Sequence, residues 1–97
     1  MFRRRGVDAL RLLADIYRTS TPPHNGEAER HYREASGMCL DLGLRPEYAR
    51  CQIGLGQTLL QSGRHGEAKR LLEEASQLCR SMGLVLTEAE LGGVSLN

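Results

Sequence analysis

Three cysteines and three histidines are the residues of this 97-residue chain whose side chains could bind a metal or attack a substrate. Cys39, Cys51 and Cys79 form no CxxC pair, whereas a structural zinc site needs four ligands, commonly in close pairs. Cys39 and Cys79 fall on apolar helical stripes, and a free cysteine in such a place behaves as a small buried hydrophobe. The spacing therefore predicts structural cysteines and no metal site.

A histidine or cysteine nucleophile is the enzymatic alternative. His24 and His65 lie in predicted turns and His31 on a helix flank, and none has a serine, cysteine or carboxylate beside it in a nucleophile motif. The run Gly54-Leu55-Gly56 lacks the further glycine, the lysine and the strand context of a nucleotide-binding loop. The sequence thus predicts solvated histidines, no catalytic residue, no cofactor and no enzyme.

The charges of the chain nearly cancel. Thirteen Lys plus Arg against twelve Asp plus Glu leave a formal charge of +1, which gives no global field to recruit nucleic acid or an anionic membrane. Met1 to Arg5 is basic but lacks aromatic interleaving, and it is expected to be a solvated lead-in. No apolar run approaches the roughly 20 residues needed to cross a bilayer. With an odd cysteine count and no secretory segment, we expect a cytoplasmic chain. Because the charges nearly cancel and no apolar run is long enough, we expect no nucleic-acid or membrane partner.

The elements that must position these residues come from an internal repeat. At an offset of 40, Gly26-Glu27-Ala28 aligns with Gly66-Glu67-Ala68, and Cys39 aligns with Cys79. Ten of the twenty residues from 26 to 45 recur, where composition alone would give about one or two. Repetition at this period indicates a stacked array of similar structural units.

Each unit is predicted to form a pair of helices, because its apolar residues follow the helical period. The first helices carry Val7, Leu10, Leu13, Ala14 and Tyr17, and then Ala49, Leu55, Gly56, Leu59 and Leu60. The second helices carry Ala28, Tyr32, Ala35, Met38, Cys39 and Leu42, and then Ala68, Leu71, Leu72, Ala75, Leu78, Cys79 and Met82. Breaks are expected at 19–26, 43–46, 63–66 and at Gly83. The prediction is an all-α domain over 1–97, with repeats at about 7–44 and 46–84 and a partial third at 86–97.

Two features of the second unit predict local contacts. Gly56 lies inside a helix, where glycine costs about 1 kcal/mol relative to alanine, so it suggests a close approach by a neighbouring helix; simple tolerance of glycine is the alternative. A charged face, with Glu67 paired to Arg70, is expected to be solvated. It consists of Glu67, Lys69, Arg70, Glu73 and Glu74.

In the second unit, small and large residues stand at offsets that resemble the tetratricopeptide family. The residues that carry the resemblance are Leu55, Gly56, Leu59, Gly63, Ala68, Leu72 and Ala75, and in the first unit Leu13, Ala14, Tyr17, Ala28, Tyr32 and Ala35, with two extra loop residues near Pro22-Pro23. The repeat departs from the family's 34 residues by running to 40, and Arg80 replaces the usual proline. This longer type resembles the C-terminal arrays of large bacterial signalling proteins that carry nucleotide cyclase or ATPase modules.

The resemblance implies a short right-handed solenoid of antiparallel helix pairs, whose concave face binds a protein or peptide. The residues expected on that face are Asp8, Arg11, Asp15, Arg18, Arg50, Ile53, Gln57 and Gln61. Arg11, Arg18 and Arg50 could bind a peptide carboxylate through paired guanidinium donors. The alternative is that these residues only solvate an unused groove.

A second hypothesis is a structural or dimerisation fragment of a larger signalling protein. Helical repeats need neighbours to bury both faces, and terminal repeats should be polar on the outside. The end of this sequence is instead apolar, with Leu84, Val85, Leu86, Leu91, Val94 and Leu96. This pattern predicts that a following helix or a second copy, in a homodimer, covers that end.

Overall fold

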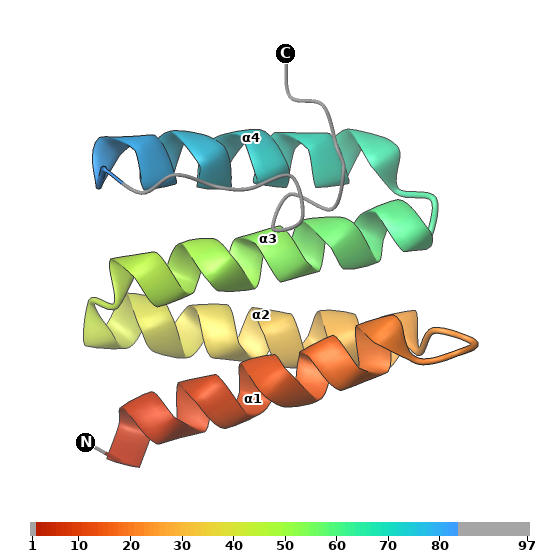
Figure 1. Ribbon diagram of the computed structural model, residues 1–97, viewed down its shortest axis with the longest axis horizontal. Coiled ribbons are helices and arrows are strands. Elements are labelled where there is room, and N and C mark those ends of the chain that lie inside the picture. The colour runs from red at the N-terminus through yellow and green to blue at the C-terminus, as the bar shows by residue number, and fades with distance from the viewer. Residues whose placement is uncertain (1, 84–97) are drawn as a thin grey trace.

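The structure, a computed structural model, describes residues 2–83, with side chains described from residue 6 onward. Four α-helices account for most of this range, and it contains no strand (Figure 1). They are α1 (Phe2–Thr19), α2 (Asn25–Leu42), α3 (Arg45–Gln61) and α4 (His65–Ser81). The all-α prediction is confirmed. The helix begins at Phe2, however, so the basic lead-in expected before residue 7 is part of α1.

The helices stack side by side in chain order. α2 packs against both α1 and α3, and α3 packs in turn against α4, while a smaller contact joins α1 to α3. Successive helices run in opposite directions, with α1 and α4 at the two ends of the row (Figure 1). The antiparallel helix pairs predicted from the repeat are therefore present, as α1 with α2 and α3 with α4.

Glycines in the left-handed conformation follow three of the helices described, including Gly83 with φ 77° after α4. Gly43 follows α2 with φ 69°, and its N–H and that of Leu44 donate to the last carbonyls of the helix. Gly63 has φ 83° in the turn after α3. A residue with a side chain would be strained at either position, so the chain reverses there at little cost. These turns confirm the breaks that the sequence predicts.

Small residues let the helices approach closely. A Cβ atom added at Gly56 would lie 2.7 Å from Cγ of Leu72, so α3 and α4 could not pack as they do with a larger residue there. This contact confirms the close approach predicted for Gly56. Ala28, Ala35, Ala68 and Ala75 are likewise buried between helices.

Two expectations about burial are wrong. Leu13, placed on the buried stripe of the first helix, is 38% exposed. Its neighbour Ala14 occupies the buried position instead, in one cluster with Ala28 and Tyr32 of α2. His31, expected to be solvated, is buried: its Nδ1 lies 2.7 Å from the carbonyl oxygen of Glu27, and its ring lies against that of Tyr17.

The third repeat predicted at 86–97 lies outside the described residues, as does the apolar cluster from Leu84 to Leu96. The homodimer expected through that cluster therefore stays a prediction.

The other two histidines, His24 and His65, are exposed as expected, although His65 begins α4 and is not part of the preceding turn.

Candidate functional site

The eight predicted site residues lie on one side of the molecule, along α1 and α3. A hollow of about 190 Å³ separates these helices, and we call it the α1–α3 groove. It is lined by Arg11, Asp15, Arg18, Arg50, Ile53, Gly54 and Gln57. Asp8 lines an adjoining hollow that shares Arg11 and Arg50 with the groove. Two helices that α2 separates in the sequence thus supply one continuous surface.

Asp15 is the acidic centre of the α1–α3 groove. Its carboxylate lies 3.5 Å from Nη1 of Arg11 and 3.6 Å from Nη2 of Arg18, one helical turn away on either side. The Nε of Arg11 is buried and has no hydrogen-bond partner among the described residues. Both guanidinium groups therefore retain N–H donors that make no close hydrogen bond to Asp15.

Tyr32 of α2 holds this cluster through hydrogen bonds to α1 residues. Its hydroxyl donates a hydrogen bond to Oδ1 of Asp15 and accepts one of 3.1 Å from Nε of Arg18. Burial, and then the hydrogen bond to Asp15, raises the pKa of Tyr32 well above its usual range. The hydroxyl consequently stays protonated, and it fixes the carboxylate and one guanidinium relative to each other.

Gly54 makes room for that tyrosine. A Cβ atom at this position would lie 2.4 Å from the ring of Tyr32, closer than any side chain could tolerate. Sequence reasoning assigned Tyr32 to the apolar stripe and considered Gly54 only as part of a run that is not a nucleotide-binding loop, so it missed their part in the groove. The available signal was the hydroxyl itself, because a buried tyrosine usually finds a hydrogen-bond partner.

Two predicted groove residues differ from the outward-facing role expected for them. Ile53 is only 5% exposed, because its side chain packs on Leu72 and Ala75 of α4, so it forms the floor of the groove. Gln61 lies at the end of the groove, where its side-chain amide donates to the carbonyl oxygen of Arg18 and to Oδ1 of Asn25. Gln61 thereby links α3 to the end of α1 and the start of α2.

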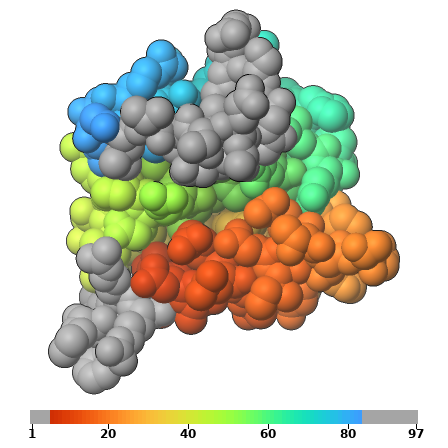
Figure 2. All heavy atoms as spheres, viewed as in Figure 1, coloured from red at the N-terminus to blue at the C-terminus, as the bar shows by residue number. Residues whose placement is uncertain are grey.

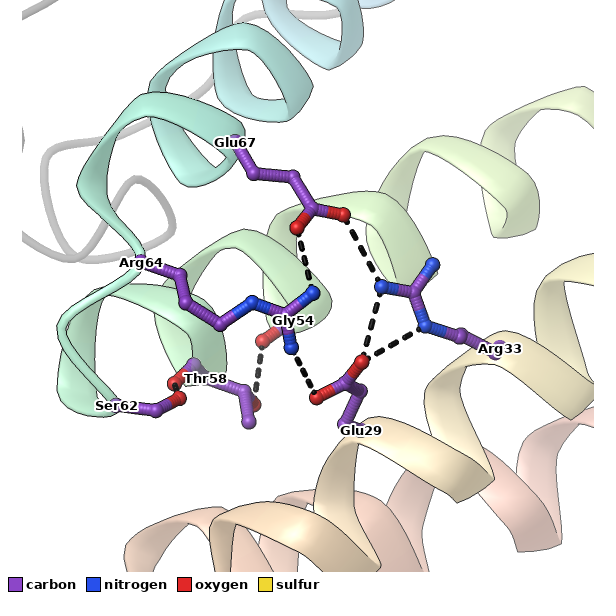
Figure 3. Close-up of polar contacts among 7 residues, drawn as sticks. All are labelled: Glu29, Arg33, Gly54, Thr58, Ser62, Arg64 and Glu67. Atoms are coloured by element: carbon purple, nitrogen blue, oxygen red, sulfur yellow. Dashed lines mark hydrogen bonds and ion pairs between the residues drawn. The ribbon is translucent and has the colours of Figure 1, made fainter.

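A ring of four charged residues links α2 to α4 (Figure 3). Arg33 and Arg64 each contact both Glu29 and Glu67, at 2.6 to 3.1 Å. We call this set the ion ring. The expected pairing of Glu67 with Arg70 is wrong, since Glu67 turns instead toward Arg64 and Arg33. The two arginines also lower the pKa of Glu67 below its usual value.

The cysteines are all free and buried, as the structural interpretation predicts. Cys39 and Cys51 belong to one apolar cluster between α1, α2 and α3. Burial raises the pKa of both thiols, that of Cys51 to about 12, so they stay protonated at neutral pH. Residues 2–83 hold no group of three histidine, cysteine or acidic side chains arranged to bind a metal. None of the helices described is both long and apolar enough to span a bilayer.

The sequence profile of the tetratricopeptide repeat matches residues 25–81, which is more than half of the chain and spans α2, α3 and α4. The chain belongs to the tetratricopeptide-repeat family. Searches of curated proteins and of solved structures found no significant match. Tetratricopeptide repeats generally mediate protein–protein interactions and are typically non-catalytic scaffolds.

Proposed function

We propose that this tetratricopeptide-repeat chain is a non-catalytic binding module and that its α1–α3 groove binds an extended peptide segment of a protein partner. The observation that carries the proposal is the arginine pair around Asp15. The Nη atoms of Arg11 and Arg18 lie 3.5 and 3.6 Å from the Asp15 carboxylate, farther than in direct hydrogen bonds, so they can donate to a ligand while Nε of Arg18 stays bonded to Tyr32.

The chemistry of the groove favours a peptide with an acidic group. Arg11, Arg18 and Arg50 outnumber the single carboxylate of Asp15 among the residues that line the groove. A guanidinium presents paired donors in a plane that matches a carboxylate. The side-chain amide of Gln57, beside them, suits the peptide backbone, since an amide both donates and accepts hydrogen bonds.

The proposal is tested by selecting short peptides with free carboxyl ends from a displayed library and titrating the best binder. We expect Arg18→Ala and Arg11→Ala each to weaken binding by roughly tenfold to a hundredfold, because each removes a charged hydrogen bond. Arg30→Ala is the matched control, since Arg30 is exposed on α2 and pairs with Glu27 away from the groove. Tyr32→Phe should weaken binding less, because it only loosens the cluster.

Two results would contradict the groove assignment. One is a library that yields no binder. The other is a binder whose affinity is unchanged in Arg11→Ala and Arg18→Ala but falls in Arg30→Ala. Circular dichroism of each variant separates lost binding from lost folding.

We further propose a cytoplasmic location, which three free buried cysteines support. The alternative role, a structural or dimerisation element of a larger bacterial signalling ATPase or nucleotide cyclase, rests on the apolar residues from Leu84 to Leu96, which a second copy would cover. The solution mass of the chain tests the dimer: a concentration-independent monomer contradicts it.

A further inference from the structure

An apolar stripe runs along the outer side of α1. Leu12, Leu13 and Ile16 are 55%, 38% and 62% exposed, and together with Leu40 they are the large apolar side chains exposed among the described residues. Leu12, Leu13 and Ile16, with exposed Ala9, follow the spacing of a single helix face. We call Ala9, Leu12, Leu13 and Ile16 the α1 stripe. Figure 2 shows α1, in red and orange, along one edge of the molecule.

The same face of α3 is buried. Allowing for the two extra loop residues of the first repeat, Leu13, Ala14 and Tyr17 align with Leu55, Gly56 and Leu59, an offset of 42. The α1 stripe then aligns with four residues of α3 that are all buried, namely Cys51, Gly54, Leu55 and Thr58. Tyr32 of α2 lies against Gly54, and Cys39 of α2 lies in the same cluster as Cys51. In α3, therefore, this face packs against the second helix of the preceding pair.

We propose that the α1 stripe is a docking site for one amphipathic helix of a partner protein, packed on α1 as α2 packs on α3. The site is separate from the α1–α3 groove, which occupies another side of α1. The α2–α3 junction supports this choice of partner, because it shows which kind of element covers this face inside the same molecule.

The residues of the stripe define what the partner helix must carry. Where α3 has Gly54, α1 has Leu12, and for a helix packed on α1 as α2 packs on α3, the larger Leu12 side chain would occupy the place that the ring of Tyr32 takes over Gly54. The partner must therefore have a small residue opposite Leu12. Where α3 has Cys51, which packs with Cys39 of α2, α1 has the smaller Ala9. The partner helix can therefore carry a larger apolar residue at the position of Cys39, seven residues after its small residue.

The second helices of this chain do not meet that requirement. α2 has Tyr32 at the critical position and is already packed between α1 and α3. α4 has Leu72 at the equivalent position, at an offset of 40, and that side chain is buried against Gly56. A second copy docking one of these helices would place a large side chain against Leu12. This mismatch favours a partner helix of different sequence.

The test uses two stapled peptides with the full chain. Both copy Asn25–Leu42, and one carries Tyr32→Ala and Cys39→Leu; a side-chain staple on the polar face keeps both helical, since isolated helices of this length are marginal in water. We expect fluorescence anisotropy to show the substituted peptide binding at least about tenfold more tightly than the native one, because overpacking is costly. Ile16→Lys in the chain should abolish this binding.

The matched control is Leu40→Lys, which changes an equally exposed leucine on α2 and should leave binding unchanged. Leu12→Gly should reverse the preference, because it restores on α1 the space that Gly54 leaves on α3. The proposal is overturned if the substituted peptide does not bind, if both peptides bind equally, or if Ile16→Lys binds like the unmodified chain. Concentration-dependent dimerisation that Ile16→Lys abolishes would assign the stripe to a second copy and overturn it too.

Discussion

The helices α1 and α3 hold the same place in successive repeats, yet one corresponding face carries mostly small, buried residues in α3 and mostly large, exposed apolar residues in α1. In α3 this face has Gly54 and Thr58 and is buried beneath α2; in α1 it has Leu12 and Ile16 and is exposed. Both helices also line the α1–α3 groove, and in α3 Gly54 belongs both to the groove and to the surface packed against Tyr32 of α2. The comparison shows that in α1 the groove and the exposed apolar face lie on different sides of the helix, whereas in α3 the groove and the stacking surface meet at Gly54.

The difference also explains which positions tolerate change. A residue buried between two helices loses contacts on all sides when it is shortened, whereas an exposed residue gives up little. Aligned residues of α1 and α3 should therefore respond very differently to the same substitution. The following predictions test that contrast.

The largest effect is expected at the aligned leucines 55 and 13. Leu55 is 2% exposed, so Leu55→Ala should lower the free energy of unfolding by about 3 kcal/mol through lost burial and a cavity. Leu13→Ala should cost less, about 1 kcal/mol, because Leu13 is 38% exposed and therefore gives up less burial than Leu55. Urea denaturation measures both. Equal losses would show that α1 and α3 are equally packed and would break the comparison.

An intermediate effect is expected at the glycines. Gly54→Ala should destabilise the chain by about 2 kcal/mol, because the added Cβ meets the ring of Tyr32. Gly37→Ala is the control: Gly37 is an exposed helix residue with nothing near its missing Cβ, so alanine should stabilise α2 by up to about 1 kcal/mol. Thermal unfolding of the two variants should move in opposite directions. A stabilised Gly54→Ala would mean that α2 does not approach α3 this closely.

The smallest effect is expected at the ion ring, which spans α3 from α2 to α4. Because Arg33 and Arg64 lower the pKa of Glu67 in the folded chain, its contribution to stability is present above its ordinary pKa of 4.5 and is lost as the pH falls through the lowered value. The stability difference between the unmodified chain and Glu67→Gln should therefore shrink between pH 6 and roughly pH 3. High salt should shrink it as well.

Glu74→Gln, on the outer side of α4, is the control for the ion ring and should show a smaller difference at every pH. If Glu67→Gln and Glu74→Gln behave alike across this range, the ring adds nothing beyond a solvated surface. That outcome would leave the stacking of α3 entirely to apolar contacts.

Local patterns in the sequence determined much of this fold. The helical period of the apolar residues and the glycines at 43 and 63 predicted all four helices and the turns between them, because both are properties of a short stretch of chain. The resemblance to the tetratricopeptide family predicted that Arg11, Asp15 and Arg18 lie on the same side as Arg50 and Gln57. The presence of a glycine inside a helix predicted the close approach at Gly56.

The tertiary structure alone decided which face of each helix has a neighbour. The period of α1 is apolar on two sides, and nothing within the helix shows that Ala14 is covered while Leu13 is exposed. The hydrogen bonds from Tyr32 to α1 and the contact of Arg33 with Glu67 join residues 14 to 34 positions apart, so they depend on how the helices are stacked. Sequence spacing defines a helix face, but only packing between helices determines what that face meets.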